Sequence, residues 1–155
     1  MNGARSARRV LPLALLLPLL AACGGNGPNG PELEALRAEA DRLARPLEAA
    51  NVYERGQGEE LGKQQQAELV REYALAGVAA AEAAAETTVE RARAEGWEVG
   101  EPSEVVAGTA WSGTKRLDRG PASLTITFVT NPDRAPDGVP VPALRLRLTH
   151  AYSTG

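Results

Sequence analysis

The sequence predicts an α+β domain in which two N-terminal helices, the second long and Ala-rich, pack on a three- to four-stranded antiparallel sheet. Apolar residues recur at spacings of three and four between residues 33 and 47, which is typical of an amphipathic helix. Ala, Glu, Gln and Arg, which favour helices, dominate residues 59–95. Beyond Gly96 apolar and polar residues alternate, as they do in half-buried strands. We expect residues 31–155 to form one domain, because a chain of this length builds a single core.

The first helix is predicted over residues 31–45. Pro31 suits the first helical position, and Glu32 and Glu34 lie where the helix dipole is positive. Pro46 disfavours helical backbone at the residue before it and therefore ends or kinks this helix. The apolar stripe, which we expect to dock within the domain although a helix of another chain is an alternative partner, consists of Leu33, Leu36, Ala40, Leu43 and Leu47.

A polar, glycine-containing stretch, residues 51–58, is predicted to be a loop, and the second helix is predicted over residues 63–95. Gly96 can adopt a positive φ just beyond a helix, so we expect it to end this one, with Trp97 packing back on the last turn. The face expected to be buried carries large side chains first and small ones later: Leu69, Tyr73, Ala76, Ala80, Ala84 and Thr87.

Three strands are predicted over residues 109–117, 122–130 and 143–152, and the first two should form a hairpin. Because side chains alternate between the two faces of a strand, one face of this sheet should be apolar and should meet the helices. That face is expected to carry Trp111, Leu117, Leu124, Ile126, Phe128, Leu144, Leu146 and Leu148.

The first 22 residues have the layout of a signal peptide. Three arginines precede a run of apolar residues at 10–20, and small residues follow it. This run spans only about 16 Å as a helix, roughly half of a bilayer core, so we do not expect it to be a stable membrane span.

The four residues that follow the apolar run, Leu20, Ala21, Ala22 and Cys23, resemble the lipobox of bacterial lipoproteins. The resemblance implies that the Cys23 thiol carries diacylglycerol and that the leader is cut between Ala22 and Cys23. It also implies an exported protein on the outer face of the cell membrane, or on the outer membrane of a host with two membranes. The alternatives are an ordinary signal peptide with an incidental cysteine, or a buried cysteine in a cytosolic protein. Residues 23–30, the acylated cysteine and a run of Gly, Asn and Pro, are predicted to be a flexible tether.

The residue inventory argues against most catalytic sites. The chain has one histidine and one cysteine, so a Ser-His-Asp triad, a Cys-His pair or a common zinc site has too few members, and no cofactor or metal is implied. His150 is interpreted as a structural histidine at the rim of the apolar sheet face. The carboxylates of residues 98–104 are interpreted as a solvated edge, and Asp133 and Asp137 as parts of an ordinary turn.

The polar face of the predicted sheet is the candidate binding surface. Removing the leader takes away three arginines and no acids, so the net charge changes from −3 to −6, which argues against nucleic acid as a partner. Basic residues nevertheless outnumber acidic ones after residue 108, and an anionic glycan, a lipid head group or an acidic envelope protein would suit such a face. Its candidate binding residues are Arg116, Thr125, Thr127, Arg145 and Arg147.

These observations predict a membrane-anchored envelope lipoprotein, held through Cys23, with a non-catalytic binding domain rather than an enzyme. Two alternatives remain at this stage. One is a small carboxylate-dependent hydrolase of the envelope, which needs only two acids. The other is a carrier that holds an apolar ligand between helix and sheet.

Overall fold

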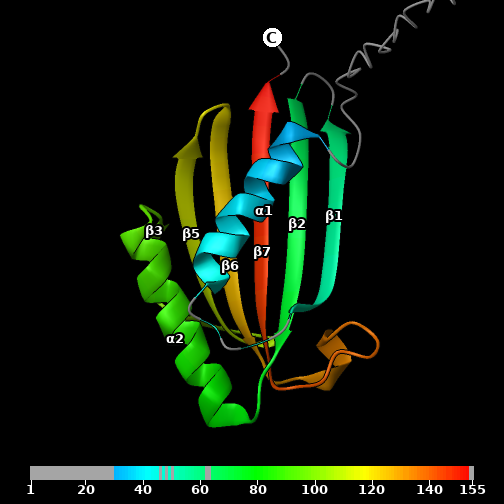
Figure 1. The fold of residues 1–155 in the computed structure, drawn as a ribbon, viewed down its shortest axis with the longest axis vertical. Coiled ribbons are helices and arrows are strands. Elements are labelled where there is room, and N and C mark those ends of the chain that lie inside the picture. Colours follow the sequence, from blue (N-terminus) through cyan, green and yellow to red (C-terminus); the bar gives the residue numbers. More distant parts are fainter. Residues whose placement is uncertain (1–29, 46, 48, 50, 62–63, 154–155) are drawn as a thin grey trace, which may run out of the picture.

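The computed structural model describes residues 30–45, 47, 49, 51–61 and 64–153 (Figure 1). The predicted signal peptide, Ala22, Cys23 and the tether up to residue 29 lie outside the described residues. In chain order the elements are α1 (Pro31–Ala44), β1 (Asn51–Leu61), β2 (Gln64–Ala74), α2 (Val78–Ala94), β3 (Glu98–Val99), β4 (Ser103–Val105), β5 (Gly108–Leu117), β6 (Gly120–Val129), the short 3₁₀ helix η1 (Pro132–Arg134) and β7 (Ala143–Ser153).

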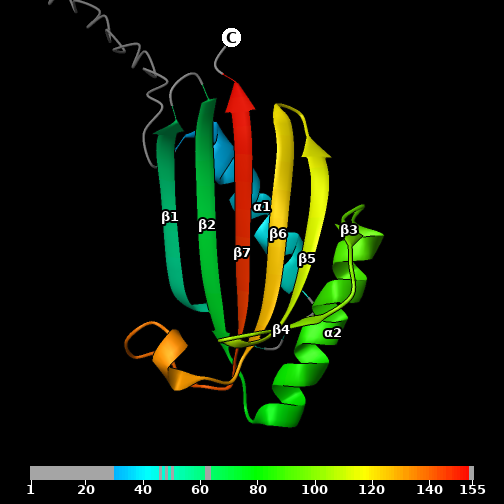
Figure 2. The ribbon, with the colours of Figure 1, turned by 180° about the vertical axis from the view of Figure 1, so that it is seen from behind.

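The strands form one seven-stranded antiparallel sheet within the described residues. Its order is β1-β2-β7-β6-β5-β3, and β4 also pairs with β5. The last strand, β7, is therefore central: it pairs with β2 on one side and with β6 on the other (Figure 2). This insertion joins the N-terminal hairpin β1–β2 to the C-terminal hairpin β5–β6 in a single sheet.

The predicted fold class was wrong in its first half. Residues 51–61 and 64–74 form the β1–β2 hairpin, in place of a loop and the first part of a long helix, and α2 begins only at Val78. The sheet accordingly has seven strands rather than three or four, and the two helices do not follow each other.

Helix propensity failed here because it differs between residues by less than about 1 kcal/mol, whereas strand pairing and burial act over the whole segment. β2 pairs with β7 along its full length and with β1 over all but its last residue. Its Ala67, Leu69 and Tyr73 alternate at a period of two and are buried in the core. That alternation was present in the sequence beneath the dense Gln, Glu and Ala.

Both α-helices cover the same face of the sheet, and the other face carries no α-helix among the described residues (Figures 1 and 2). α1 buries Leu33, Leu36 and Leu43 against it. α2 buries mainly small residues, among them Ala81, Ala85 and Ala92, which let the helix lie close to the strands. The sheet contributes most of the large, fully buried side chains, which include Leu69, Leu124, Ile126, Leu144, Leu146 and Leu148.

The end of α2 follows the local chemistry of its sequence. Gly96 adopts a φ of 87°, and its N–H donates to the carbonyl of Arg93. The N–H of Trp97 donates to the carbonyl of Ala92, and the Trp97 side chain is buried in the core. Its indole Nε1 donates to Glu39 of α1 at 3.2 Å, so Trp97 also ties the two helices together.

A single glycine of β1, Gly56, leaves room for the first turn of α1. A Cβ at Gly56 would lie 2.8 Å from Cδ2 of Leu33, whereas one at Gly58 would meet nothing within 4 Å. Neither helix in the described residues combines the length and the apolar character that crossing a bilayer would require.

Candidate functional site

The bare face of the sheet collects four of the five candidate residues. Thr125 lies opposite Arg147, and Thr127 lies opposite Arg145, in the β6–β7 register. The four side chains are therefore neighbours in the middle of the sheet. Arg116 is the exception: it pairs with Pro121 at the end of β5, while Thr125 pairs with Ser112. It does not belong to the same cluster.

Two glutamates of β2, which sequence reasoning missed, complete this face. Arg147 donates to Oε2 of Glu68 from Nε at 3.0 Å and from Nη2 at 2.6 Å. Arg145 donates from Nε to Oε1 of Glu72 at 2.5 Å. The sequence pattern predicts a helix over this segment, so it does not place the two acids on the sheet. On a strand, Glu68 and Glu72 point to the same face because they are an even number of residues apart.

Glu68 is shared by two arginines. Arg55 of β1 donates from Nη2 to Oε1 of Glu68 at 3.1 Å, on the side opposite Arg147. The Glu68 side chain is only 10% exposed, but those of Arg55 and Arg147 are 55% and 56% exposed. One enclosed carboxylate thus orients two cations, and the excess positive charge faces solvent.

Glu72 lies deeper, beside the loop that leads into β7. Its side chain is fully buried, and this burial raises the pKa of its carboxyl, while the hydrogen bond from Arg145 opposes the rise. No described residue donates a hydrogen bond to its second oxygen, Oε2. Arg145 also donates to the backbone carbonyl of Arg134 at 2.5 Å, which holds the loop of residues 131–142 against the sheet.

The surface around Arg147 is a groove made of three adjoining hollows, of about 410, 400 and 240 Å³. The first lies over β1 and β2 and is bounded by Pro136. The second lies beneath residues 105–107, where Val105 and Val106 are 43% and 69% exposed. The third adds polar side chains, Gln66, Ser123 and Thr149. The β4 segment and the loop of residues 131–142 lie at one end of this face (Figure 2).

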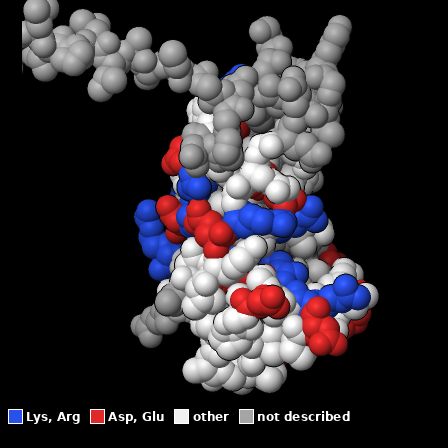
Figure 3. Space-filling model, turned by 90° about the vertical axis from the view of Figure 1, so that its right-hand side faces the viewer, with Lys and Arg blue, Asp and Glu red and all other residues white. Residues whose placement is uncertain are grey.

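A second charged network lies on the helix side, where basic and acidic side chains alternate near the β1 edge (Figure 3). Arg71 of β2 donates to Asp41 of α1 at 2.5 Å and to Glu54 of β1 at 2.8 Å, and Glu54 also accepts from Arg37 at 2.9 Å. Burial opposes the charge of Glu54, but the bonds from Arg37 and Arg71 outweigh it and lower the pKa of its carboxyl. This network fastens α1 to the hairpin.

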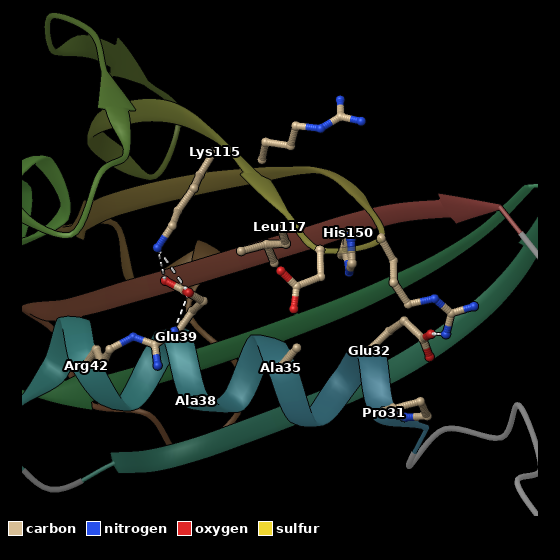
Figure 4. Close-up of a pocket in the computed structure, with 12 residues that line it drawn as sticks. Pro31, Glu32, Ala35, Ala38, Glu39, Arg42, Lys115, Leu117 and His150 are labelled. Atoms are coloured by element: carbon tan, nitrogen blue, oxygen red, sulfur yellow. Dashed lines mark hydrogen bonds and ion pairs between the residues drawn. The ribbon is translucent and has the colours of Figure 1, made fainter.

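A cleft opens on the helix side between α1 and the end of the β5–β6 hairpin, with a volume of about 590 Å³ (Figure 4). Glu39 accepts from Lys115 at 3.1 Å through each of its oxygens and pairs with Arg42, and Glu32 pairs with Arg119. His150 lines the cleft and is buried; burial lowers the pKa of its imidazole, and the nearby Glu32 carboxylate opposes this effect.

The other acids that the sequence analysis considered do not form a site together. Glu98, Glu101 and Glu104 are exposed, and the Glu104 carboxylate accepts a bond from Thr109 at 2.9 Å. The N–H of Asp133 donates to the Asn131 side chain within the turn of η1. Across the described residues, no group of three or more His, Cys, Asp or Glu side chains is placed to hold a metal ion.

Fold and site together define a two-layer domain of α and β structure, with helices on one face of an antiparallel sheet and an arginine-centred groove on the other. Comparison of the chain with protein-family models, with curated proteins and with solved structures finds no match.

Proposed function

We propose that this chain is a bacterial lipoprotein that is exported and anchored through an acylated Cys23 to the outer face of the cell membrane, or to the outer membrane of a host with two. The sequence at residues 20–23 and the signal-peptide layout before it support the proposal. Cys23 is also the only cysteine, so acylation leaves no free thiol.

In this proposal the domain is a non-catalytic binding module whose groove takes an anionic glycan of the envelope. The main support is that Arg55 and Arg147 both form ion pairs with Glu68. Each guanidinium is therefore oriented, while more than half of each arginine side chain stays exposed. A guanidinium has five N–H donors in a planar fork and binds carboxylates or phosphates in pairs of hydrogen bonds. An anion at Arg147 therefore has donors that Glu68 leaves unused.

The rest of the lining favours a glycan over a protein partner. Besides the arginines, six hydroxyl or amide side chains line the groove, whereas its apolar side chains gather mainly in the hollow at residues 105–110: the six polar ones are Tyr53, Gln66, Ser123, Thr125, Thr127 and Thr149. These groups suit a ligand rich in hydroxyls and carboxylates, whereas the centre of a protein interface is depleted in charge and enriched in large apolar anchors.

The groove is tested with a uronic-acid polymer, polygalacturonate, and with neutral galactan as the comparison. We expect Arg147→Glu to weaken polygalacturonate binding by at least about tenfold, because it removes donors and places a carboxylate beside Glu68. Arg91→Glu is the matched control, since it makes the same charge change on an exposed position of α2. Galactan bound as tightly as polygalacturonate, or unchanged binding by Arg147→Glu, would contradict the proposal. Preferential binding of polyglutamate would favour an acidic protein instead.

The anchor is tested separately by metabolic labelling with palmitate and by phase partitioning. The unaltered chain should incorporate label and enter the detergent phase, and Cys23→Ser should do neither, because it lacks the thiol that would carry diacylglycerol. A Cys23→Ser chain that still incorporated palmitate and partitioned with detergent would sink the lipoprotein assignment while leaving the groove untouched.

A further inference from the structure

The cleft between α1 and the β5–β6 hairpin has the shape of a site for an elongated small molecule. One side of α1 lines it, with Pro31, Ala35, Ala38 and Arg42 at spacings of three and four. The end of β5, the following turn and His150 form the opposite wall (Figure 4). Its volume of about 590 Å³ lies within the usual range for small-ligand sites.

The middle of this cleft has an apolar wall, and both ends are charged. Ala35 and Ala38 are exposed on α1, and Leu117 faces them from β5 (Figure 4). The two buried carboxylates, Glu32 and Glu39, lie seven residues apart, which separates them by about 10 Å along the helix. A ligand that fills the cleft therefore needs an apolar body with a polar group at an end.

The two ends differ in what they still offer a ligand. Glu39 is saturated: Lys115 donates to both of its oxygens, Trp97 donates to Oε2, and Arg42 donates to Oε1. Glu32 is 3% exposed, and Arg119 donates to its Oε1. No described residue donates a hydrogen bond to Oε2 of Glu32, although that atom is buried. A buried acceptor without a donor is costly, so the Glu32 end suits a ligand that brings one.

The charges around Glu32 indicate which kind of hydrogen-bond donor the ligand should carry. Arg119 already neutralises this carboxylate, and the residues that line the cleft include four cations, Arg42, Lys115, Arg116 and Arg119, against three acids, Glu32, Glu39 and Asp118. An ammonium group on the ligand would meet the like charge of Arg119 here, and a carboxylate head would lie against Glu32. An uncharged hydroxyl supplies the donor without either repulsion.

We propose that this cleft binds an uncharged single-chain amphiphile, with the chain against Ala35, Ala38 and Leu117 and a hydroxyl of the head donating to Oε2 of Glu32. The site lies on the helix side of the sheet, so it is separate from the arginine groove. The inference does not rest on the proposed glycan binding or on the lipid anchor.

The test uses the full chain carrying Cys23→Ser and measures binding by calorimetry. 1-Decanoylglycerol provides chain and hydroxyls, methyl decanoate provides the chain without a donor, and glycerol provides hydroxyls without a chain. We expect decanoylglycerol to bind about tenfold more tightly than methyl decanoate and glycerol not to bind. In Glu32→Ala this preference should disappear, because the acceptor is gone, while methyl decanoate still binds.

A steric block tests where the chain lies. Ala38→Phe should weaken decanoylglycerol binding by at least about tenfold, because the ring fills the apolar middle of the cleft. Ala83→Phe is the matched control, since Ala83 is an exposed alanine of α2 outside the lining. Circular dichroism of each variant checks folding, and Ala35→Phe provides a second block if Ala38→Phe unfolds.

Three results would overturn the inference. Methyl decanoate that bound as tightly as decanoylglycerol would remove the role of the donor. Unchanged binding by both blocking variants would place the chain elsewhere. Decylamine or decanoate that bound more tightly than decanoylglycerol would show that the head is charged.

Discussion

The two sides of β2 use ion pairs in opposite ways. On the helix side, the Arg71 side chain is 10% exposed and is enclosed between Asp41 and Glu54. On the bare side, the enclosed partner is the carboxylate, Glu68, and its two arginines extend into solvent. At Arg71 the enclosed cation fastens a helix to a hairpin, whereas at Glu68 the enclosed anion leaves its two cations exposed to solvent. On β2 the covered-side pairs therefore hold two elements together, and the bare-side pairs leave exposed the cations that the proposed glycan binding uses.

The largest expected effect comes from the apolar row of the covered side. Leu146 is fully buried on the central strand β7, so Leu146→Ala should lower the free energy of unfolding by about 4 kcal/mol through lost burial and a cavity. Thr125→Ala, on the bare side of neighbouring β6, should change it by about 0.5 kcal/mol or less. Urea unfolding of both variants measures the contrast, and equal losses would contradict it.

The next largest effect on the free energy of unfolding distinguishes the ion pairs of the helix side from those of the bare side. Glu39→Ala should cost about 3 kcal/mol, because it leaves Lys115 and the buried indole N–H of Trp97 without their acceptor. Arg147→Ala should cost less than about 1 kcal/mol, since its guanidinium is largely hydrated. A loss for Arg147→Ala as large as that for Glu39→Ala would show that the bare-side pairs are structural after all.

A smaller effect tests how closely the helix layer approaches the sheet edge. Gly56→Val should cost about 2 kcal/mol, because its Cβ would collide with Leu33, which is itself buried. Gly58→Val, two residues along the same strand, meets no neighbour and should be neutral or slightly stabilising, since valine favours strands. If thermal unfolding ranked the two variants equally, Leu33 of α1 would not pack closely against Gly56.

The smallest effects are slopes of stability against pH, and they have opposite signs on the two sides. Burial lowers the pKa of His150 below its ordinary 6.5, so as the pH falls through 6.5 the unfolded chain takes up a proton that the folded chain does not. Stability should therefore decrease on acidification through this range. His150 is the only histidine, so His150→Gln should remove this slope in urea titrations. A slope that survived the substitution would assign it to another group.

Glu72 should give stability the opposite pH dependence to that of His150. Burial raises the pKa of its carboxyl above the ordinary 4.5, with Arg145 opposing, so the folded chain binds a proton at a higher pH than the unfolded chain does. Stability should then fall as the pH rises from 4.5 towards the raised pKa. Glu72→Gln should abolish this loss, measured against His150→Gln as the background; a loss that persisted would contradict the shift.

Periodicity in the sequence located some elements closely and missed others. α1 begins at Pro31 and ends within a residue of the prediction, and β5, β6 and β7 lie where alternation indicated strands. The β1–β2 hairpin was missed, because Gln, Glu and Ala favour a helix locally and nothing nearby in sequence reveals that β7 will pair with β2.

Because β2 was predicted to be a helix, only part of the candidate site could be predicted from the sequence. Thr125, Thr127, Arg145 and Arg147 could be grouped from their parity within strands. Their partners on β2, Glu68 and Glu72, could not be grouped with them once that segment was taken as a helix. The cleft beside α1 was out of reach for a different reason: Glu39 and Lys115 are 76 residues apart, and no local pattern pairs them.

The sequence by itself determined the local periods, the helix end at Gly96, the alternating faces of the last three strands and the lipobox-like tetrad ending at Cys23. These depend on residues a few positions apart, where sterics and side-chain spacing act directly. Only the tertiary structure decided that β7 enters between β2 and β6, and with it which charges meet. That choice depends on burial and pairing between distant segments, whose combined free energy outweighs the local preference of each.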